Sequence, residues 1–303
     1  MGEQLPAVSV IVAAYNSDRF LPGCLDSLKQ QGFGDFETIV VNSSPETRTA
    51  EVMSAYPDVR FFQSLQRLFP HAARNTGVSL ARGRLFAFTD ADCQADPNWL
   101  AELVAAFAAG HEIIGGCIDS RAERLVSRAI YVLKYSPYQR GLPAEPIPMA
   151  ATGSLLVSRR VLELVGGFDG SIFCGDALLS WQARAAGFPP WFQPKAIVTD
   201  QDELYRWRFL AERFTRGREY GRVRAVFENW SRLRQLLRIC ATPLALGAAL
   251  LAIGRHCQRG SRLGDFLKTF PFLFVAQGAW CLGEAFGYQL TSSQVDAGSQ
   301  SRG

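Results

Sequence analysis

Short apolar runs alternate with helix-like stretches through the first third of the chain. Residues 7–14 read AVSVIVAA, a small and β-branched run typical of a strand that is buried on both faces of a parallel sheet. Similar runs recur about every 20 to 25 residues, separated by amphipathic patterns. We expect strands at 7–14, 36–41, 59–62 and 85–89, and helices at 16–31, 47–56, 71–81 and 97–109. This order predicts an α/β fold with a doubly wound, mostly parallel sheet.

Polar residues follow three of these strands directly. Tyr15 and Asn16 follow the first strand, and Asn42 follows the second. The fourth strand leads into Asp90 and Asp92. In open α/β sheets the ligand binds beyond the carboxyl ends of the strands, so we expect these side chains to line one site. The sequence has neither G-x-G-x-x-G after its first strand nor G-x-x-x-x-G-K-[ST], which disfavours a dehydrogenase or a P-loop NTPase.

The Asp90-Ala91-Asp92 sequence carries the clearest chemistry. Two carboxylates at one strand end repel each other unless a cation or hydrogen bonds neutralise them. Magnesium and manganese are hard ions that take one or two protein carboxylates together with the phosphate oxygens of a substrate. One interpretation is therefore metal-bridged binding of a diphosphate. The other is a solvated acidic loop ahead of the helix at 97–109.

Composition narrows the class of protein. The chain of 303 residues is 48% hydrophobic and 20% charged, which excludes a wholly disordered chain. It lacks the repeated apolar runs of roughly 18 or more residues that a multi-span transporter needs. Its seven cysteines form no C-x-x-C pair, so reduced thiols in a cytosolic setting are expected. The N-terminus has no basic region ahead of its apolar run, which argues against a signal peptide.

Charge is unevenly distributed along the chain. Residues 1–203 contain 17 Lys and Arg against 22 Asp and Glu, whereas residues 204–270 contain 14 against 4. Arginines interleave with aromatic residues in 204–238, a pattern that suits an anionic bilayer surface or, alternatively, a nucleic acid. The uncharged runs 239–254 and 269–283 that follow favour the membrane, although each is shorter than the roughly 20 residues of a comfortable span. A re-entrant or interfacial hairpin is expected; two spans or a buried soluble hairpin remain alternatives.

The ordered motifs resemble a known enzyme family. VSVIVAAYNS, ETIVVNSSPETRTAEV and HAARNTGVSLARGRLFAFTDADC resemble the nucleotide-sugar-binding half of GT-A-fold family 2 glycosyltransferases. ATGSLLVSRRVLELVGGFDGSIFCGDALLSWQARAAG resembles their acceptor half, and AWCLGEAFGYQL the membrane-associated extension of some bacterial members. The expected organisation is a GT-A domain at 1–203 with halves 1–118 and 119–203, a membrane-associating helical region at 204–290, and a disordered tail at 291–303.

The resemblance implies a role for individual residues. The nucleotide-sugar donor would be bound by Ala14, Tyr15, Asn16, Asn42, Arg74, Asn75 and Asp90. The divalent metal, magnesium or manganese, would be bound by Asp92 and Asp90. The acceptor would meet Gly153, Ser154 and Trp181, and Asp176 would be the general base, in a loop just before a helix. The resemblance also implies that Gly77 allows close helix packing.

Three positions depart from the family pattern. Asn42 replaces an Asp, and Gly175 replaces the Glu that precedes the base. Where the family often has a histidine near the end of the next strand, this sequence offers Asp200 or Asp202 as an oxygen ligand instead. These departures keep open a weaker metal site, or a catalytically weak homologue that acts as a binding or scaffold subunit. A nucleotidyltransferase is a further alternative, although the Gly-rich, Lys-containing phosphate loop of that class is missing.

The favoured hypothesis is a metal-dependent glycosyltransferase that inverts the anomeric carbon. It would move a sugar from a nucleoside-diphosphate donor to a lipid-linked or cell-surface glycan acceptor. A direct displacement by one base opposite the leaving group requires this inversion. We expect the enzyme at the cytoplasmic face of the inner membrane, with no nucleic-acid partner.

Overall fold

The structure is a computed structural model that describes residues 5–45, 48–201 and 209–300, with side chains as far as residue 289. Its contacts divide the chain into two compact units. Unit 1 contains Met1–Arg121 and Tyr138–Asp202, and unit 2 contains Ala122–Pro137 and Glu203–Gly303. The chain thus enters unit 2 briefly before it completes unit 1.

Unit 1 is built on one mixed sheet of eight strands, in the order β3-β2-β1-β4-β7-β6-β8-β5. The pairs β1–β2, β2–β3, β1–β4 and β6–β8 are parallel, and the pairs made by β7 and by β5 are antiparallel. The predicted α/β fold with a mostly parallel sheet is confirmed. The strands are β1 (Val8–Ala14), β2 (Phe36–Asn42), β3 (Arg60–Gln63), β4 (Leu85–Asp90), β5 (Cys93–Ala95), β6 (Ile113–Ser120), β7 (Ser154–Ser158) and β8 (Trp191–Asp200).

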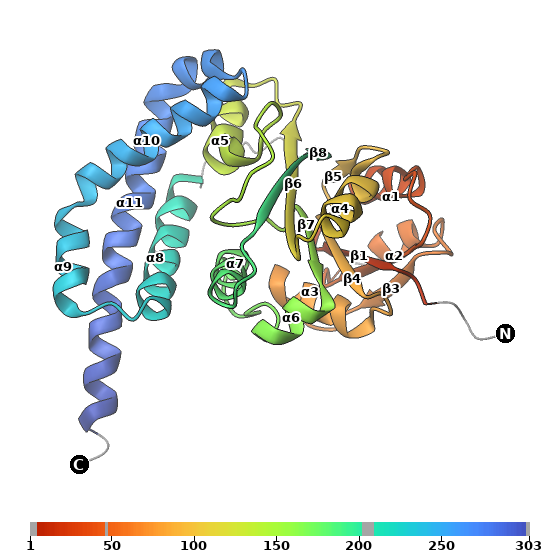
Figure 1. Ribbon diagram of the computed structural model, residues 1–303, viewed down its shortest axis with the longest axis horizontal. Coiled ribbons are helices and arrows are strands. Elements are labelled where there is room, and N and C mark those ends of the chain that lie inside the picture. Colours follow the sequence, from red (N-terminus) through yellow and green to blue (C-terminus); the bar gives the residue numbers. More distant parts are fainter. Residues whose placement is uncertain (1–4, 46–47, 202–208, 301–303) are drawn as a thin grey trace. The chain divides into compact units, whose positions relative to one another are not determined.

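Helices cover both faces of this sheet, with α1 and α4 on one side and α3 and α6 on the other (Figure 1). Their packing can be very close: a Cβ on Gly77 of α3 would overlap the Ile11 side chain of β1, as expected for this glycine. The helices of unit 1 are α1 (Leu21–Lys29), α2 (Arg48–Met53), α3 (Pro70–Leu80), α4 (Trp99–Ala108), α6 (Arg159–Val165) and α7 (Gly175–Ala185).

Two predicted boundaries in unit 1 shift for identifiable reasons. The helix expected at 16–31 begins only at Leu21, because Asn16 adopts a left-handed conformation with φ 52° that a right-handed helix cannot contain. Asp176 was expected in a loop but is the second residue of α7. There its Oδ1 accepts a hydrogen bond from the backbone N–H of Ala177 at 2.9 Å, which helps to satisfy the open end of the helix.

The described residues of unit 2 form helices and their connections. The helices are α5 (Leu125–Tyr135), α8 (Phe209–Phe227), α9 (Arg232–Cys240), α10 (Thr242–Arg259) and α11 (Leu263–Gln300), and a 3-10 turn, Ser136–Tyr138, follows α5. The apolar face of α5 packs into one core with residues from the later helices, including Leu250 of α10 and Leu273 of α11. Arg128 of α5 also pairs with Asp265 of α11.

This core changes two expectations about domain organisation. The sequence placed 122–137 in the acceptor half, whereas the burial of Ile130 and its neighbours among the C-terminal helices groups this segment with unit 2. In addition, α11 continues to Gln300, across most of the tail that was expected to be disordered.

Helices α8 and α11 meet along a seam of four glycines. Gly217 and Gly221 of α8 face Gly283 and Gly287 of α11 at four-residue spacing. A Cβ added to any of them would come closer than 3.0 Å to a backbone carbonyl of the opposite helix. The two backbones can therefore approach this closely only because no side chain separates them.

No helix in the described part of the chain is by itself long and apolar enough to cross a bilayer. Helices α9 and α10 satisfy the length and composition requirement only as a pair, and the pair is bent by 66°. The apolar run 239–254 is thus divided between two helices.

Candidate active site

A cavity of about 290 Å³ opens in unit 1 at the carboxyl ends of β1 and β4. Four of the predicted donor residues contribute to its wall, namely Ala14, Tyr15, Arg74 and Asp90, together with the predicted metal ligand Asp92. The remaining lining residues are Ala13, Ser17, Ser43, Arg67, Leu68, Phe69, Pro70, Ala73, Ala91 and Phe173. Parallel strands thus deliver their polar ends to one place, as the sequence pattern predicts.

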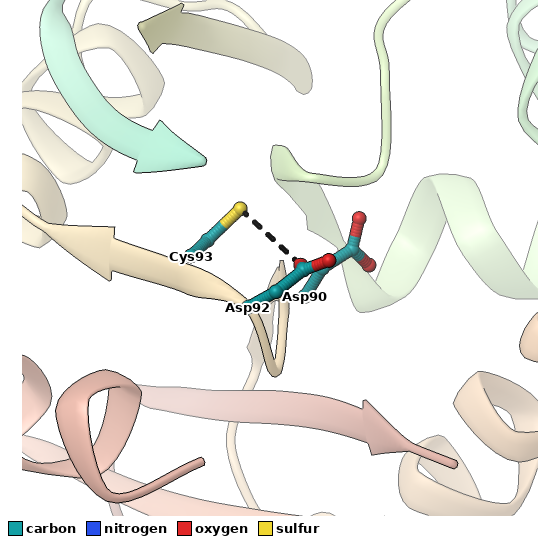
Figure 2. Close-up of side chains that lie close together, drawn as sticks. All are labelled: Asp90, Asp92 and Cys93. Carbon is teal, nitrogen blue, oxygen red and sulfur yellow. Dashed lines mark hydrogen bonds between the residues drawn. The ribbon is translucent and has the colours of Figure 1, made fainter. Parts of the chain in front are cut away.

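The turn between β4 and β5 brings three ligand-type side chains together. Asp90, Asp92 and Cys93 each have one such atom within 4.8 Å of the others (Figure 2). The Cys93 thiol donates to Asp92 Oδ1 at 3.9 Å. Burial, reinforced by the nearby carboxylates, raises the pKa of this thiol well above its usual range, so it stays protonated. The two carboxylates are oxygen donors of the kind that magnesium and manganese prefer.

Asp200, the proposed third oxygen ligand, does not belong to this group. It is buried at the end of β8, where it pairs in the ladder with Cys93. The tight turn after β4 gathers Asp90 and Asp92, whereas Asp200 is positioned by a neighbouring strand and lines no part of the cavity. Asp202 lies outside the described residues.

Arg74 is the buried cation of the cavity. It lies in α3, and its Nη2 donates to Asp90 Oδ1 at 2.5 Å. Its Nη1 contacts His71 Nδ1 at 3.2 Å. Its Nε is buried and makes no hydrogen bond within the part of the chain that the structure describes. A guanidinium in a cavity wall is the side chain that pairs best with an anionic ligand such as a phosphate.

An aromatic and basic group that the sequence reasoning missed forms another part of the wall. The guanidinium of Arg67 lies 4.5 Å from the ring centroid of Tyr15. Phe69 and Phe173, both largely exposed, meet edge to face with centroids 5.2 Å apart. Arg67 and Phe69 precede α3 directly, so their position between the end of β3 and that helix is the sequence feature that could have identified them.

Several predicted donor residues lie outside the cavity lining. The Asn42 side chain is fully buried, and its Oδ1 accepts from the Ser44 hydroxyl at 2.8 Å while its Nδ2 donates to Gln63 at 2.8 Å. The Asn75 side chain makes two hydrogen bonds to the backbone of Phe168. It donates to the carbonyl at 2.7 Å and accepts from the N–H at 3.1 Å. Both amides therefore fix loops, and Ser43, next to Asn42, lines the cavity instead.

Asn16 also stabilises a loop and does not line the cavity. Its backbone N–H donates to the hydroxyl of Ser44 at 2.7 Å, which ties the end of β1 to the end of β2. The predicted role for its side chain in donor binding has no counterpart in the cavity lining.

The predicted acceptor residues occupy different environments. Gly153 lies beside the site, since a Cβ there would be 3.4 Å from Asp90 Oδ2. Ser154 is fully buried, and its hydroxyl accepts from the indole N–H of Trp99 at 2.9 Å, so it braces the sheet. Trp181 is partly buried on α7 and lines no part of the cavity.

Asp176 is partly buried near the charges of the site. Its carboxyl lies close enough to Arg74 and Asp90 to be influenced by both. Burial raises its pKa, while Arg74 and the Ala177 N–H act in the opposite direction. A raised pKa suits a carboxylate that must accept a proton.

Comparison with known proteins shows which family the chain belongs to. A model of the family described as glycosyl transferase family 2 matches residues 9–166, more than half of the sequence. The chain belongs to glycosyl transferase family 2. Glycosyltransferase AglE of Haloferax volcanii, an archaeal protein, is 29% identical over 299 residues, which cover 93% of this chain and 94% of the relative. Putative glycosyltransferase EpsH of Bacillus subtilis is 32% identical over 133 residues, covering 39% and 38%.

Solved structures agree on the GT-A fold. A mannosyltransferase of Pyrobaculum calidifontis, PcManGT, solved with GDP-Man and Mn²⁺, superposes with a TM-score of 0.59 at 18% identity, covering 89% of this chain and 88% of that one. GalNAc-T7, solved with UDP, GalNAc and Mn²⁺, gives a TM-score of 0.53 at 18% identity and covers 67% of this chain. The predicted family and fold are confirmed, and the protein is a glycosyltransferase.

Proposed function

We propose that this glycosyltransferase moves a sugar from a nucleoside-diphosphate donor to a lipid-linked or cell-surface glycan acceptor, with inversion at the anomeric carbon and with a divalent metal as cofactor. The observation that supports it most directly is the meeting of Arg74, Asp90 and Asp92 in one cavity at the sheet edge. A cation and a pair of carboxylates are the groups that a metal–diphosphate unit requires.

The residues of the cavity fit a nucleotide. Tyr15, with Arg67 over its ring, offers a flat aromatic face for a base or ribose. Arg74 lines the same cavity and supplies a guanidinium, the group that pairs best with a phosphate. Charge grows on that diphosphate as the glycosidic bond breaks, so a guanidinium placed there stabilises the transition state more than the ground state.

The metal would be held by Asp92 and by Asp90, whose Oδ1 also pairs with Arg74. When bound, a divalent ion neutralises charge on the leaving diphosphate. Two structural relatives were solved with Mn²⁺ and a nucleotide or nucleotide sugar, which supports the same cofactor and donor class here.

Asp176 is the proposed general base. A sugar hydroxyl is a poor nucleophile until a positioned carboxylate accepts its proton. With one such base and no covalent intermediate, the hydroxyl attacks the anomeric carbon opposite the diphosphate, and the bond to the diphosphate oxygen breaks. The product has inverted configuration, and the proton resides on Asp176.

The metal role predicts a large effect of Asp92→Asn. A panel of nucleotide sugars with Mn²⁺, GDP-mannose among them, first identifies the donor by its thermal stabilisation of the protein. With that donor, we expect the variant to lose roughly 10²- to 10³-fold in kcat/KM, since one ligand of the charge-neutralising ion is gone. Nucleoside-diphosphate release is the measurement.

Asp35→Asn is the matched control, because Asp35 is exposed at the start of β2, at the opposite end of the strands. Full turnover by Asp92→Asn would contradict the metal role. A wild-type protein that binds donor and metal yet transfers and hydrolyses nothing would instead support the scaffold alternative.

The lipid-linked acceptor is proposed from the surface of unit 2. The C-terminal end of α9, the N-terminal end of α10 and the middle of α11 line an apolar groove of about 570 Å³. Exposed leucines and phenylalanines surround it, among them Leu237, Leu244, Leu282 and Phe286. Arginines flank these apolar residues on α9, although Arg234 and Arg238 also stack over Trp230 at 4.7 and 5.3 Å. An exposed apolar face bordered by cations suits an anionic bilayer, at the cytoplasmic side of the inner membrane in our proposal.

Vesicle flotation tests this surface. We expect the protein to float with phosphatidylcholine vesicles that contain phosphatidylglycerol, more weakly with phosphatidylcholine alone, and less at high salt. Replacing Leu244 and Leu282 together by Asp should reduce flotation at least roughly tenfold, because two charges would enter the apolar face. Leu164→Asp, at an exposed leucine of α6 in unit 1, is the control.

Undiminished flotation of the double variant would contradict the proposed membrane surface. So would a change from dimer to monomer in the double variant without lipid, since the face would then be covered by a second copy of the chain.

A further inference from the structure

A line of hydrogen bonds runs from the α6–α7 loop to the carboxylates of the cavity. His71 Nε2 lies 3.1 Å from the carbonyl oxygen of Phe173. On the other side of the ring, His71 Nδ1 lies 3.2 Å from Arg74 Nη1, and Arg74 Nη2 donates to Asp90 Oδ1. The imidazole therefore links a loop that carries a cavity residue to the cation that faces the donor site.

The partners determine the state of this ring. A guanidinium has only N–H donors, so Nδ1 must be the acceptor of the Arg74 bond. The proton of the neutral ring then resides on Nε2 and is donated to the Phe173 carbonyl. Burial and the charge of Arg74 lower the pKa of His71 to about 4, which agrees with a neutral ring at physiological pH.

Gly175 provides the room for this ring. A Cβ on Gly175 would lie 2.7 Å from His71 Cδ2 and 2.9 Å from Cγ, too close for any side chain. It would also lie 3.1 Å from the carbonyl oxygen of Asp169. The imidazole thus fills the volume that a side chain just before Asp176 would need.

The first two turns of α3 contact the rest of the same loop. The His71 ring stacks on Phe168 with centroids 5.1 Å apart, and Asn75 grips the Phe168 backbone from both sides. Gly170 packs directly on Ala72, since a Cβ there would be 3.1 Å from Ala72 Cα. The segment that leads to Asp176 therefore contacts α3 at several points, through Phe168, Gly170, Phe173 and Gly175.

We propose that His71 is a positioning residue of this glycosyltransferase, which aligns Arg74 with Asp90 on the donor side and fixes the Phe173–Asp176 segment on the acceptor side. It acts through its neighbours and touches no reacting atom. The inference rests on the proposed function, because Arg74 and Asp176 are the groups that it positions.

The hydrogen bond between His71 and Arg74 restricts the orientation of the guanidinium. Arg74 is only 4% exposed, so a rotation away from Asp90 would leave further buried N–H groups without partners. His71 holds one of these groups and so restricts the guanidinium to a single orientation. A misplacement of about 1 Å at a transition-state contact can cost on the order of 10²-fold in rate.

Three substitutions separate the two bonds. His71→Asn keeps an acceptor near the place of Nδ1 and loses the donor to Phe173. His71→Gln can reach the place of Nε2 and loses the acceptor for Arg74, and His71→Ala loses both. We expect His71→Ala to lower kcat roughly 10²-fold. His71→Gln should raise the donor KM most relative to its loss of kcat. His71→Asn should keep the donor KM near that of the wild type. His111→Ala, which removes a ring stacked on Trp191 outside the cavity, is the control.

Gly175 gives a second, reciprocal test. Gly175→Ala alone should lose activity, because its Cβ would displace the ring. Combined with His71→Ala, it should add little further loss, since the two closest obstructing atoms belong to the imidazole ring and only the Asp169 carbonyl oxygen, at 3.1 Å, remains. Strictly additive losses would overturn the proposal. So would wild-type kinetics in His71→Ala, or losses in Ala, Asn and Gln that follow only the melting temperature.

The ring can also be observed without turnover. Nitrogen-15 spectra of the full chain should show a neutral His71 protonated on Nε2 between pH 5 and pH 7, and this readout requires neither donor nor acceptor. A cationic ring, or a proton on Nδ1, would overturn the proposal. If the ring has the expected state but the wild type turns over no nucleotide sugar, the proposed function fails while the geometry around Arg74 stands.

Discussion

Asp176→Asn should abolish sugar transfer while leaving donor binding intact. The substitution keeps the size of the side chain but removes its negative charge and its ability to accept a proton, so kcat should fall by roughly 10²- to 10⁴-fold, the usual contribution of a general base. The affinity for the nucleotide sugar should stay within about twofold of the wild type, because Asp176 lines no part of the cavity. Nucleoside-diphosphate release and calorimetric titration of the donor measure the two quantities.

The pH profile provides a sharper version of the same test. Burial raises the pKa of Asp176 above its ordinary value. The base works deprotonated, so the rate should fall as the pH is lowered through this raised pKa, and the acid limb should lie above the range of an exposed aspartate. This limb should be missing from the residual activity of Asp176→Asn.

Asp58→Asn is the matched control, since Asp58 is exposed on the loop before β3 and lines no part of the cavity. A kcat for Asp176→Asn within tenfold of the wild type would exclude Asp176 as the base. A collapse of donor binding would indicate a role in the donor site instead.

Gly283→Ala should destabilise unit 2 by about 1 to 3 kcal/mol, the usual cost of overpacking. At an unobstructed helical position the same change is favourable by about 0.5 to 1 kcal/mol, because alanine restricts the unfolded chain and favours the helix. At Gly283 the new methyl group would instead press on the Phe214 carbonyl and the backbone N–H of Arg218. These are backbone atoms of α8, which cannot move aside as a side chain could, so overpacking outweighs the helix preference.

Gly247→Ala is the internal control, because a Cβ at Gly247 of α10 meets no atom within 4 Å. It should stabilise unit 2 slightly. The free energy of unfolding from helical circular dichroism in denaturant, together with the rate of tryptic cleavage in the arginine-rich helices, measures both variants. Changes of the same sign at 247 and 283 would contradict the description of the glycine seam.

The sequence predicted the sheet of unit 1 where local pattern decides structure. Buried apolar runs marked β1, β2 and β4, and their polar ends converge as expected on Asp90 and Asp92. The antiparallel insertion of β7 between β4 and β6 could not be read in this way, since the direction of a strand depends on a chain reversal far away in sequence. The three residues of β5 are too short for a periodic pattern.

Side-chain roles were harder to predict than positions. Asn42, Asn75 and Ser154 lie near the site, yet each uses its hydrogen-bonding groups on a neighbouring loop or on Trp99. Residue type indicates what a side chain can bond, and the fold decides which partner comes within reach. The same limit applies to Gly175, because the reason for a residue without a side chain there is visible only when the structure places His71 beside it.

The position of α5 within unit 2 also determines when its core can form during synthesis of the chain. Ile130 and its neighbours leave the ribosome about 140 residues before the part of α11 that completes their core. At about 5 to 20 residues per second, this apolar helix waits roughly 7 to 28 seconds for its partners. During that time the sheet of unit 1 can assemble around a gap in its own sequence, while α5 offers an apolar face to a chaperone or a nearby membrane. The last helices of this glycosyltransferase therefore complete a core that was begun before its active site was finished.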